Sequence, residues 1–196
     1  MHCARPVISS MNDLRLVALT STVMKVCERV VLCKLGKLLK DYINPLQFAY
    51  RKNRGTDDAV LYSLENIYSH LEKTGSTVRL MFAHFSSAFN TIQSHLLVQK
   101  LLNMKLPSSA ISWIFDYLTS RLQYVRLNGL LSSAISSNTG APQGTVLAPF
   151  SFALYTADCR STDESCPVVK FADDTEWLEK LVLMKMQYTT SRLKTL

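Results

Sequence analysis

The chain has 196 residues, of which 47% are hydrophobic and 19% are charged, so its composition excludes a disordered protein and indicates one domain, or one domain of two lobes. The net charge of +7 favours a polyanionic partner such as nucleic acid. Five scattered cysteines without a C-x-x-C pair indicate reduced thiols rather than a zinc site. Because no membrane span or signal peptide is recognisable, we expect an intracellular protein, nuclear or cytoplasmic, without a membrane partner.

The first predicted helix covers residues 21–39. Thr20 or Ser21 can cap its start, and apolar residues recur along it at helical spacing. The residues expected to face the core are Val23, Cys27, Val30, Val31, Leu35 and Leu38. The segment 42–45, which ends in proline, breaks the pattern.

A second helix and a strand follow. Thr56 can cap the helix, and Asp57 and Asp58 then lie in its first turn, where the helix dipole favours negative charge. The residues expected to face inward are Val60, Leu64, Ile67 and Leu71. Gly75 ends this helix, and residues 77–85 read as a strand.

The second half of the chain alternates short helices with hairpins. Helical spacing of apolar residues predicts helices at 94–104, 108–118 and 146–155. Between them, residues 122–128 alternate as a strand does, end at Gly129 and would pair with 132–138 in a hairpin.

Two adjacent carboxylates end the next apolar stretch. Residues 168–172 read as a buried strand, with Asp173 and Asp174 at its tip. Paired acids at such a place repel each other, and a pair of divalent cations would offset the repulsion and supply chemistry. The alternative for this pair on its own is an ordinary Asp-rich hairpin turn.

Four sequence blocks occur in order along residues 12–178. They are NDLRLVALTS at 12–21, QFAYRKNRGTDDA at 47–59, TGAPQGTVLAP at 139–149 and FADD at 171–174. Together they resemble the reverse transcriptase domain of non-long-terminal-repeat, LINE-type retrotransposons, with Leu16 in place of a usual proline. The resemblance implies an α+β fold, with a right-hand polymerase palm built on a small antiparallel sheet backed by helices, and with partial fingers.

The resemblance also implies a reaction. The family copies an RNA template into DNA from a DNA primer and deoxynucleoside triphosphates (dNTP), with two Mg²⁺ ions as cofactors. Asp173 and Asp174 match its metal-binding and catalytic turn, in which Asp173 would be essential. The implied division is fingers at 12–75, palm at 76–178 and a divergent tail at 179–196.

One catalytic position departs from the family pattern. In LMFAHFSSAFN at 80–90, His84 stands where the family has its first catalytic Asp, and the match from Phe85 to Phe89 fixes the register. Imidazole is a poor Mg²⁺ ligand and carries no negative charge. We therefore expect weakened metal sites and catalysis slowed on the order of a thousandfold or more.

The resemblance places further residues at a nucleotide pocket. Phe89 would screen the 2′-position of the incoming sugar, Gln143 and Gly144 would line the pocket, and Arg51 would hold the triphosphate. The respective alternatives are a core aromatic, a plain turn and a solvated arginine. Other basic residues with weaker expectations are Arg54 at the triphosphate and Lys52, Arg121 and Arg126 at the template backbone.

Nothing after the acidic turn resembles the family's helical thumb, and no endonuclease block precedes residue 12. The sequence thus predicts a truncated reverse transcriptase-like fragment that is inactive or nearly so. Two alternatives stay open, a non-catalytic nucleic-acid-binding module and a decayed retroelement remnant without a selected function. The oligomeric state stays open as well.

Overall fold

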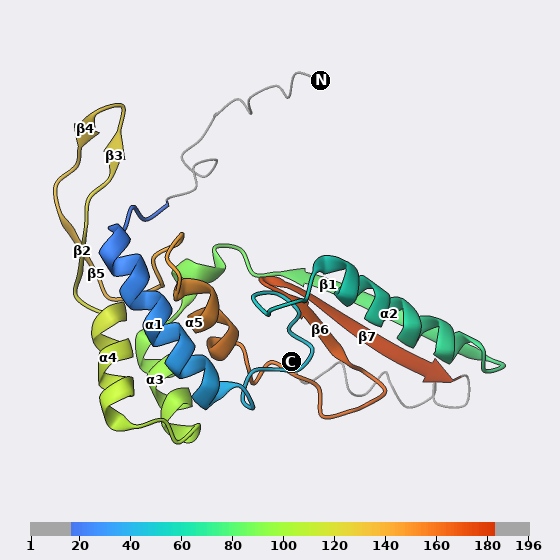
Figure 1. Ribbon diagram of the computed structural model, residues 1–196. Coiled ribbons are helices and arrows are strands. Elements are labelled where there is room, and N and C mark those ends of the chain that lie inside the picture. The colour runs from blue at the N-terminus through green and yellow to red at the C-terminus, as the bar shows by residue number, and fades with distance from the viewer. Residues whose placement is uncertain (1–16, 183–196) are drawn as a thin grey trace.

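The computed structural model describes residues 17–182, which form two adjoining parts (Figure 1). Residues 12–16 of the first block and residues 183–196 of the expected tail lie outside the described residues. One part gathers the helices α1 (Thr22–Leu39), α3 (Ser94–Asn103), α4 (Ser108–Leu118) and α5 (Ala148–Tyr155). The other part is a sheet of β1 (Ser76–His84), β6 (Val168–Phe171) and β7 (Asp174–Val182), covered on one face by α2 (Thr56–Leu71).

The sheet is antiparallel throughout, with strand order β1-β7-β6. The central strand β7 buries Leu178 and Leu181, which anchors it between its neighbours. Its register with β1 sets His84 directly opposite Asp174. The small antiparallel sheet backed by a helix confirms the predicted α+β class.

Helix α2 packs on the sheet through small and polar residues. Ala59 is buried, Ser63 Oγ donates to Glu176 Oε2 at 2.9 Å, and His70 Nε2 lies 2.9 Å from Leu181 O. The predicted inward face was therefore wrong, since Val60, Leu64 and Leu71 are exposed. Polar bonds to β7 decide how α2 is turned, and the hydrophobic pattern does not contain that information.

The start of α2 also differs from the prediction. Its N-cap is Gly55 rather than Thr56, and Asp58 Oδ2 accepts a hydrogen bond from Gly55 N at 2.6 Å. Asp58 thus acts through direct bonding as well as through the helix dipole.

Helix α1 shows the same kind of correction. Ser21 caps it as predicted, accepting a hydrogen bond from Met24 N at 3.2 Å. Its buried residues are Glu28, Leu35 and Leu39, whereas Val23, Val30 and Leu38 of the predicted face are exposed. The Glu28 carboxylate accepts from the backbone near the start of α5, and this contact orients α1.

The helices α1, α3, α4 and α5 share one hydrophobic core with the short 3-10 helix η2 (Ala88–Thr91). Its fully buried large side chains are Leu39, Ile92, Leu97, Leu101, Leu118, Phe152 and Leu154. The predicted helices in the second half of the chain are confirmed, with ends that differ by one or two residues.

The predicted hairpin forms, but it is interrupted. β2 (Arg121–Gln123) pairs with β5 (Ile135–Ser137), and β3 (Arg126–Leu127) pairs with β4 (Leu130–Leu131). The turn is Asn128-Gly129, both with positive φ, as a two-residue hairpin requires. The hairpin projects away from the helices (Figure 1), so its apolar residues do not reach the core.

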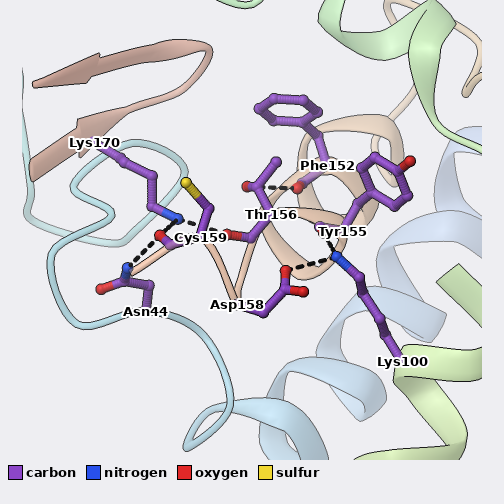
Figure 2. A network of polar contacts seen from close by, with 8 residues as sticks. All are labelled: Asn44, Lys100, Phe152, Tyr155, Thr156, Asp158, Cys159 and Lys170. Carbon is purple, nitrogen blue, oxygen red and sulfur yellow. Dashed lines mark hydrogen bonds and ion pairs between the residues drawn. The ribbon is translucent and has the colours of Figure 1, made fainter. Parts of the chain in front are cut away.

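A buried lysine joins the two parts (Figure 2). Val169 packs against α2, so Lys170, the next residue of β6, points to the other face of the sheet. Its Nζ donates to Thr156 O at 2.6 Å and to Cys159 O at 2.9 Å, and burial lowers its pKa. Beside it, Lys100 pairs with Asp158 at 2.6 Å. Carbonyl dipoles at the end of α5 thus stabilise the charge of Lys170.

No helix within residues 17–182 has both the length and the apolar character needed to cross a bilayer. The four cysteines in this range are unpaired.

Candidate metal centre

Three side chains converge where β1 ends and the β6–β7 turn begins. His84 Nδ1 lies 2.9 Å from Asp174 Oδ1 and 3.6 Å from Asp173 Oδ2. One ligand atom from each residue lies within 4.8 Å of the other two, so the three could hold a metal ion. The sequence argument that the strand ending in His84 lies beside the acidic turn is confirmed by this geometry.

Hydrogen bonds to the backbone fix the turn that carries the acids. Ala172 has a φ of 59°, in the left-handed region, which costs a non-glycine residue about 1 kcal/mol. The buried side chain of Gln47 accepts from Ala172 N at 3.0 Å and donates to Ala172 O at 3.2 Å. On the other side, Phe85 N donates to Asp173 O at 3.0 Å. These bonds hold Asp173 and His84 in register.

Sequence reasoning missed Gln47, although the block that contains it had been recognised. Leu46 and Phe48 exchange backbone bonds with Lys170, both at 2.8 Å, and this places the Gln47 side chain under the turn. A glutamine between apolar residues in a short segment was the available signal.

Tyr50 was missed as well. Burial raises the pKa of its phenol, and the negative charge of Asp173 adds to the rise.

His84, Asp173 and Asp174, called the triad below, are accessible to solvent. The His84 side chain is 58% exposed, Asp174 is 72% exposed and Asp173 is 33% exposed. Water therefore screens the repulsion between the carboxylates, and His84 lies within hydrogen-bond distance of one of them. A cavity of about 420 Å³ with mainly apolar walls opens between the triad and the start of α2.

The glycine-rich block lies against the segment that contains Phe89. Ala141 N donates to Phe89 O at 2.7 Å, and Gly140 N donates to Ile92 O at 2.7 Å. A Cβ on Gly140 would come within 2.9 Å of Asn90 Cα, so glycine is required for this approach. The Phe89 ring packs 5.8 Å from the Phe152 ring, which agrees with the core-aromatic reading and leaves its role toward a sugar as a prediction.

Gln143 and Gly144 lie further along the same block. Gln143 O accepts from Ala18 N at 2.7 Å, and Gly144 has a φ of 93°. The first recognised block therefore contacts the glycine-rich block directly. A nucleotide-binding role for either residue stays a prediction.

Side chains from α1 and α4 hold the glycine-rich block in place. Glu28 Oε2 accepts from Val146 N at 2.6 Å and from Leu147 N at 3.1 Å. The Tyr117 hydroxyl donates to Thr145 Oγ1 at 2.9 Å. Burial raises the pKa of Tyr117 to about 12, and the charge of Glu28 adds to the rise. Neither Glu28 nor Tyr117 was singled out from the sequence.

Arg121 completes this arrangement from β2. Its guanidinium donates to Gly140 O at 2.9 Å and to Leu118 O at 3.1 Å, and burial lowers its pKa. Nε and Nη2 of Arg121 thus bind carbonyl groups of the chain, and its expected contact with the template backbone stays a prediction.

The other predicted basic residues are exposed. Arg51 Nη1 donates to Pro45 O at 2.9 Å, and the Arg54 guanidinium lies 5.3 Å from the centroid of the Phe48 ring. Lys52 and Arg126 are exposed too. The expected roles of these residues toward triphosphate or template stay predictions.

Comparison with known proteins agrees with the sequence blocks. A family model described as reverse transcriptase (RNA-dependent DNA polymerase) matches residues 7–179. The probable RNA-directed DNA polymerase from transposon X-element of Drosophila melanogaster is 27% identical over 169 residues, 82% of this chain and 18% of the relative. The corresponding protein from transposon BS of the same fly is 24% identical over 151 residues, 76% of this chain and 16% of the relative. The chain thus spans less than a fifth of either relative.

A solved structure shares the fold. Telomerase from Candida tropicalis, in complex with a fragment of telomeric RNA, matches 88% of this chain and 30% of its own with a TM-score of 0.59. At 11% identity this likeness shows the fold alone, and it confirms the expected polymerase palm. The family match across residues 7–179 and the transposon relatives together show that the chain belongs to the reverse transcriptase family.

Proposed function

We propose that the chain is the fingers and palm portion of a retrotransposon reverse transcriptase that is impaired in DNA synthesis. The proposal rests on the position of His84, which lies directly opposite Asp174 and whose Nδ1 is 3.6 Å from Asp173 Oδ2. In the family's chemistry this place needs a carboxylate. The division into fingers at 12–75 and palm at 76–178, with a divergent tail at 179–196, belongs to the same proposal.

The residues present do not fit a pair of Mg²⁺ ions. Mg²⁺ requires oxygen ligands in near-octahedral geometry, and the triad supplies an imidazole where a third carboxylate would stand. Two acidic side chains remain to balance two divalent ions. We therefore assign no Mg²⁺-dependent step to this chain, and the expected loss in rate is on the order of a thousandfold or more.

The natural partners under this proposal are an RNA template, a DNA primer and dNTP. The net charge of +7 supports attraction to a nucleic-acid backbone. Phe89, Gln143 and Gly144 would contact the incoming nucleotide, with Arg51 at its triphosphate. An intracellular location, nuclear or cytoplasmic, fits such partners.

Primer extension on an RNA template tests the proposal. We expect no measurable extension by the wild-type chain with Mg²⁺, weak extension by His84→Asp, and none by the double variant His84→Asp/Asp173→Asn. Extension by the wild-type chain on the order of one nucleotide per second or faster would refute impairment. The Asp173→Asn change identifies a contaminating polymerase, because it removes the central acid of the site.

A second candidate function is nucleic-acid binding without catalysis. It is favoured by the exposed basic residues Arg51, Lys52 and Arg54 in one short loop. Binding to RNA–DNA hybrid should then weaken steeply with salt, and His84→Asp should add no extension. Absence of hybrid binding at low salt would contradict this candidate.

A further inference from the structure

Given the function proposed above, on which this step rests, we infer that His84, Asp173 and Asp174 bind a single borderline transition-metal ion, such as Co²⁺ or Zn²⁺, in preference to Mg²⁺. The replacement of a carboxylate by an imidazole thus changes the metal that the palm selects, in addition to weakening its original chemistry.

The donor atoms favour this class of metal. Imidazole nitrogen suits Zn²⁺, Co²⁺ and related ions, whereas Mg²⁺ takes oxygen ligands almost without exception. The triad offers the Nδ1 of His84 and one carboxylate oxygen from each of Asp173 and Asp174. Sites where Zn²⁺ keeps a position open for water use three protein ligands, which can combine His nitrogen with carboxylate oxygen.

The spacing of the donors allows all three to share one ion. Ligands bonded at about 2.0–2.2 Å around a tetrahedral ion lie roughly 3.3–3.6 Å apart. His84 Nδ1 lies 2.9 Å from Asp174 Oδ1 and 3.6 Å from Asp173 Oδ2. The two carboxylate oxygens lie within 4.8 Å of each other, so modest movement of the exposed side chains would bring the three donors around one ion.

The same imidazole removes one of the groups that could bridge two ions. A carboxylate can bridge two metals because it has two oxygens, each with free lone pairs. Imidazole Nδ1 has a single lone pair, and Nε2 lies on the far side of the ring. His84 therefore cannot take the bridging place of a carboxylate.

The backbone beneath the site is already fixed. Gln47 holds Ala172 on both its N–H and its carbonyl, and Phe85 N donates to Asp173 O. Binding of the ion therefore costs little conformational entropy of the backbone. The exposure of Asp174 leaves room for water ligands. Preorganised supports of this kind usually raise metal affinity.

Calorimetric titration of the whole chain with CoCl₂ and with MgCl₂ tests the inference. We expect the ratio of Mg²⁺ to Co²⁺ dissociation constants to be at least about tenfold larger for the wild-type chain than for His84→Asp. His84→Ala should lower Co²⁺ affinity by about tenfold or more and should fold normally, because His84 is 58% exposed. The matched control His95→Ala, which truncates an exposed histidine on α3, should change neither constant.

The outcomes separate this inference from the proposed function. Equal Co²⁺ affinity in wild type and His84→Ala would overturn the inference, because the ion would then bind without His84. An unchanged metal ratio in His84→Asp would overturn it too. Binding of the chain to RNA–DNA hybrid, measured with a chelator present, does not depend on the ion. Absence of this binding would count against the proposed function and would leave the metal preference unaffected.

Discussion

Gln47→Ala should destabilise the fold and loosen the acidic turn. The side chain is 1% exposed and makes three hydrogen bonds to backbone, two to Ala172 and one from Ala49 N. The bond from Ala49 N is buried, and an unpaired donor there costs about 1–3 kcal/mol. The bonds to Ala172 add about 1 kcal/mol each where water replaces them poorly. The total loss is therefore about 3–5 kcal/mol, a large share of a typical domain's stability.

Urea denaturation followed by circular dichroism measures this loss. A change of this size lowers the urea midpoint by on the order of 1–2 M. The matched control is Gln99→Ala, which removes the same atoms from an exposed position of α3 and should stay within about 0.5 kcal/mol of wild type. Co²⁺ affinity should fall about tenfold in Gln47→Ala alone, because the turn holds two of the three ligands. Equal midpoints and equal Co²⁺ affinities for the two variants would refute the assigned role of Gln47.

Three further predictions concern the polar contacts that join the elements. Glu28→Ala should lower the free energy of unfolding by about 3 kcal/mol, because it leaves two amides at the start of α5 unpaired, and Glu28→Gln should restore more than half of this loss in urea titrations. Burial lowers the pKa of Lys170, so its folding penalty is greatest below the lowered pKa and disappears as pH rises toward the unfolded value of about 10.4. The stability of wild type relative to Lys170→Met should accordingly increase with pH in that window, and a constant difference would contradict the assignment. The raised pKa of Tyr117 stabilises the fold below about pH 10, and this contribution is lost between pH 10 and about 12. Tyr117→Phe should therefore remove one tyrosine that ionises near pH 12 from the ultraviolet titration.

The local elements could be read from the sequence because their signals are local. Ser21 caps α1 through its own side chain, and the Asn128-Gly129 turn needs only two residues that tolerate positive φ. The alignment of His84 with the acidic turn was also predictable, since the residues around both positions fixed the register. Each of these inferences depends on a few neighbouring residues.

The orientation of α1 and α2 could not be read in the same way. Both helices carry apolar residues on more than one face, and both bury a face that contains polar groups. Glu28 of α1 reaches amides 118 and 119 positions away, and Ser63 of α2 reaches Glu176, 113 positions away. Such long-range polar bonds decide helix rotation when hydrophobicity does not, and a single sequence gives no sign of the partner.

The substitution at residue 84 therefore acts on chemistry far more than on folding. Its side chain is more than half exposed, and the bonds that shape the turn come from Gln47 and from backbone groups on either side. A palm supported in this way keeps its register whether position 84 carries a carboxylate or an imidazole. The scaffold and the proposed metal ligands are thus separable in this chain, and under the inference above one histidine would alter metal preference while the surrounding fold remains that of a reverse transcriptase.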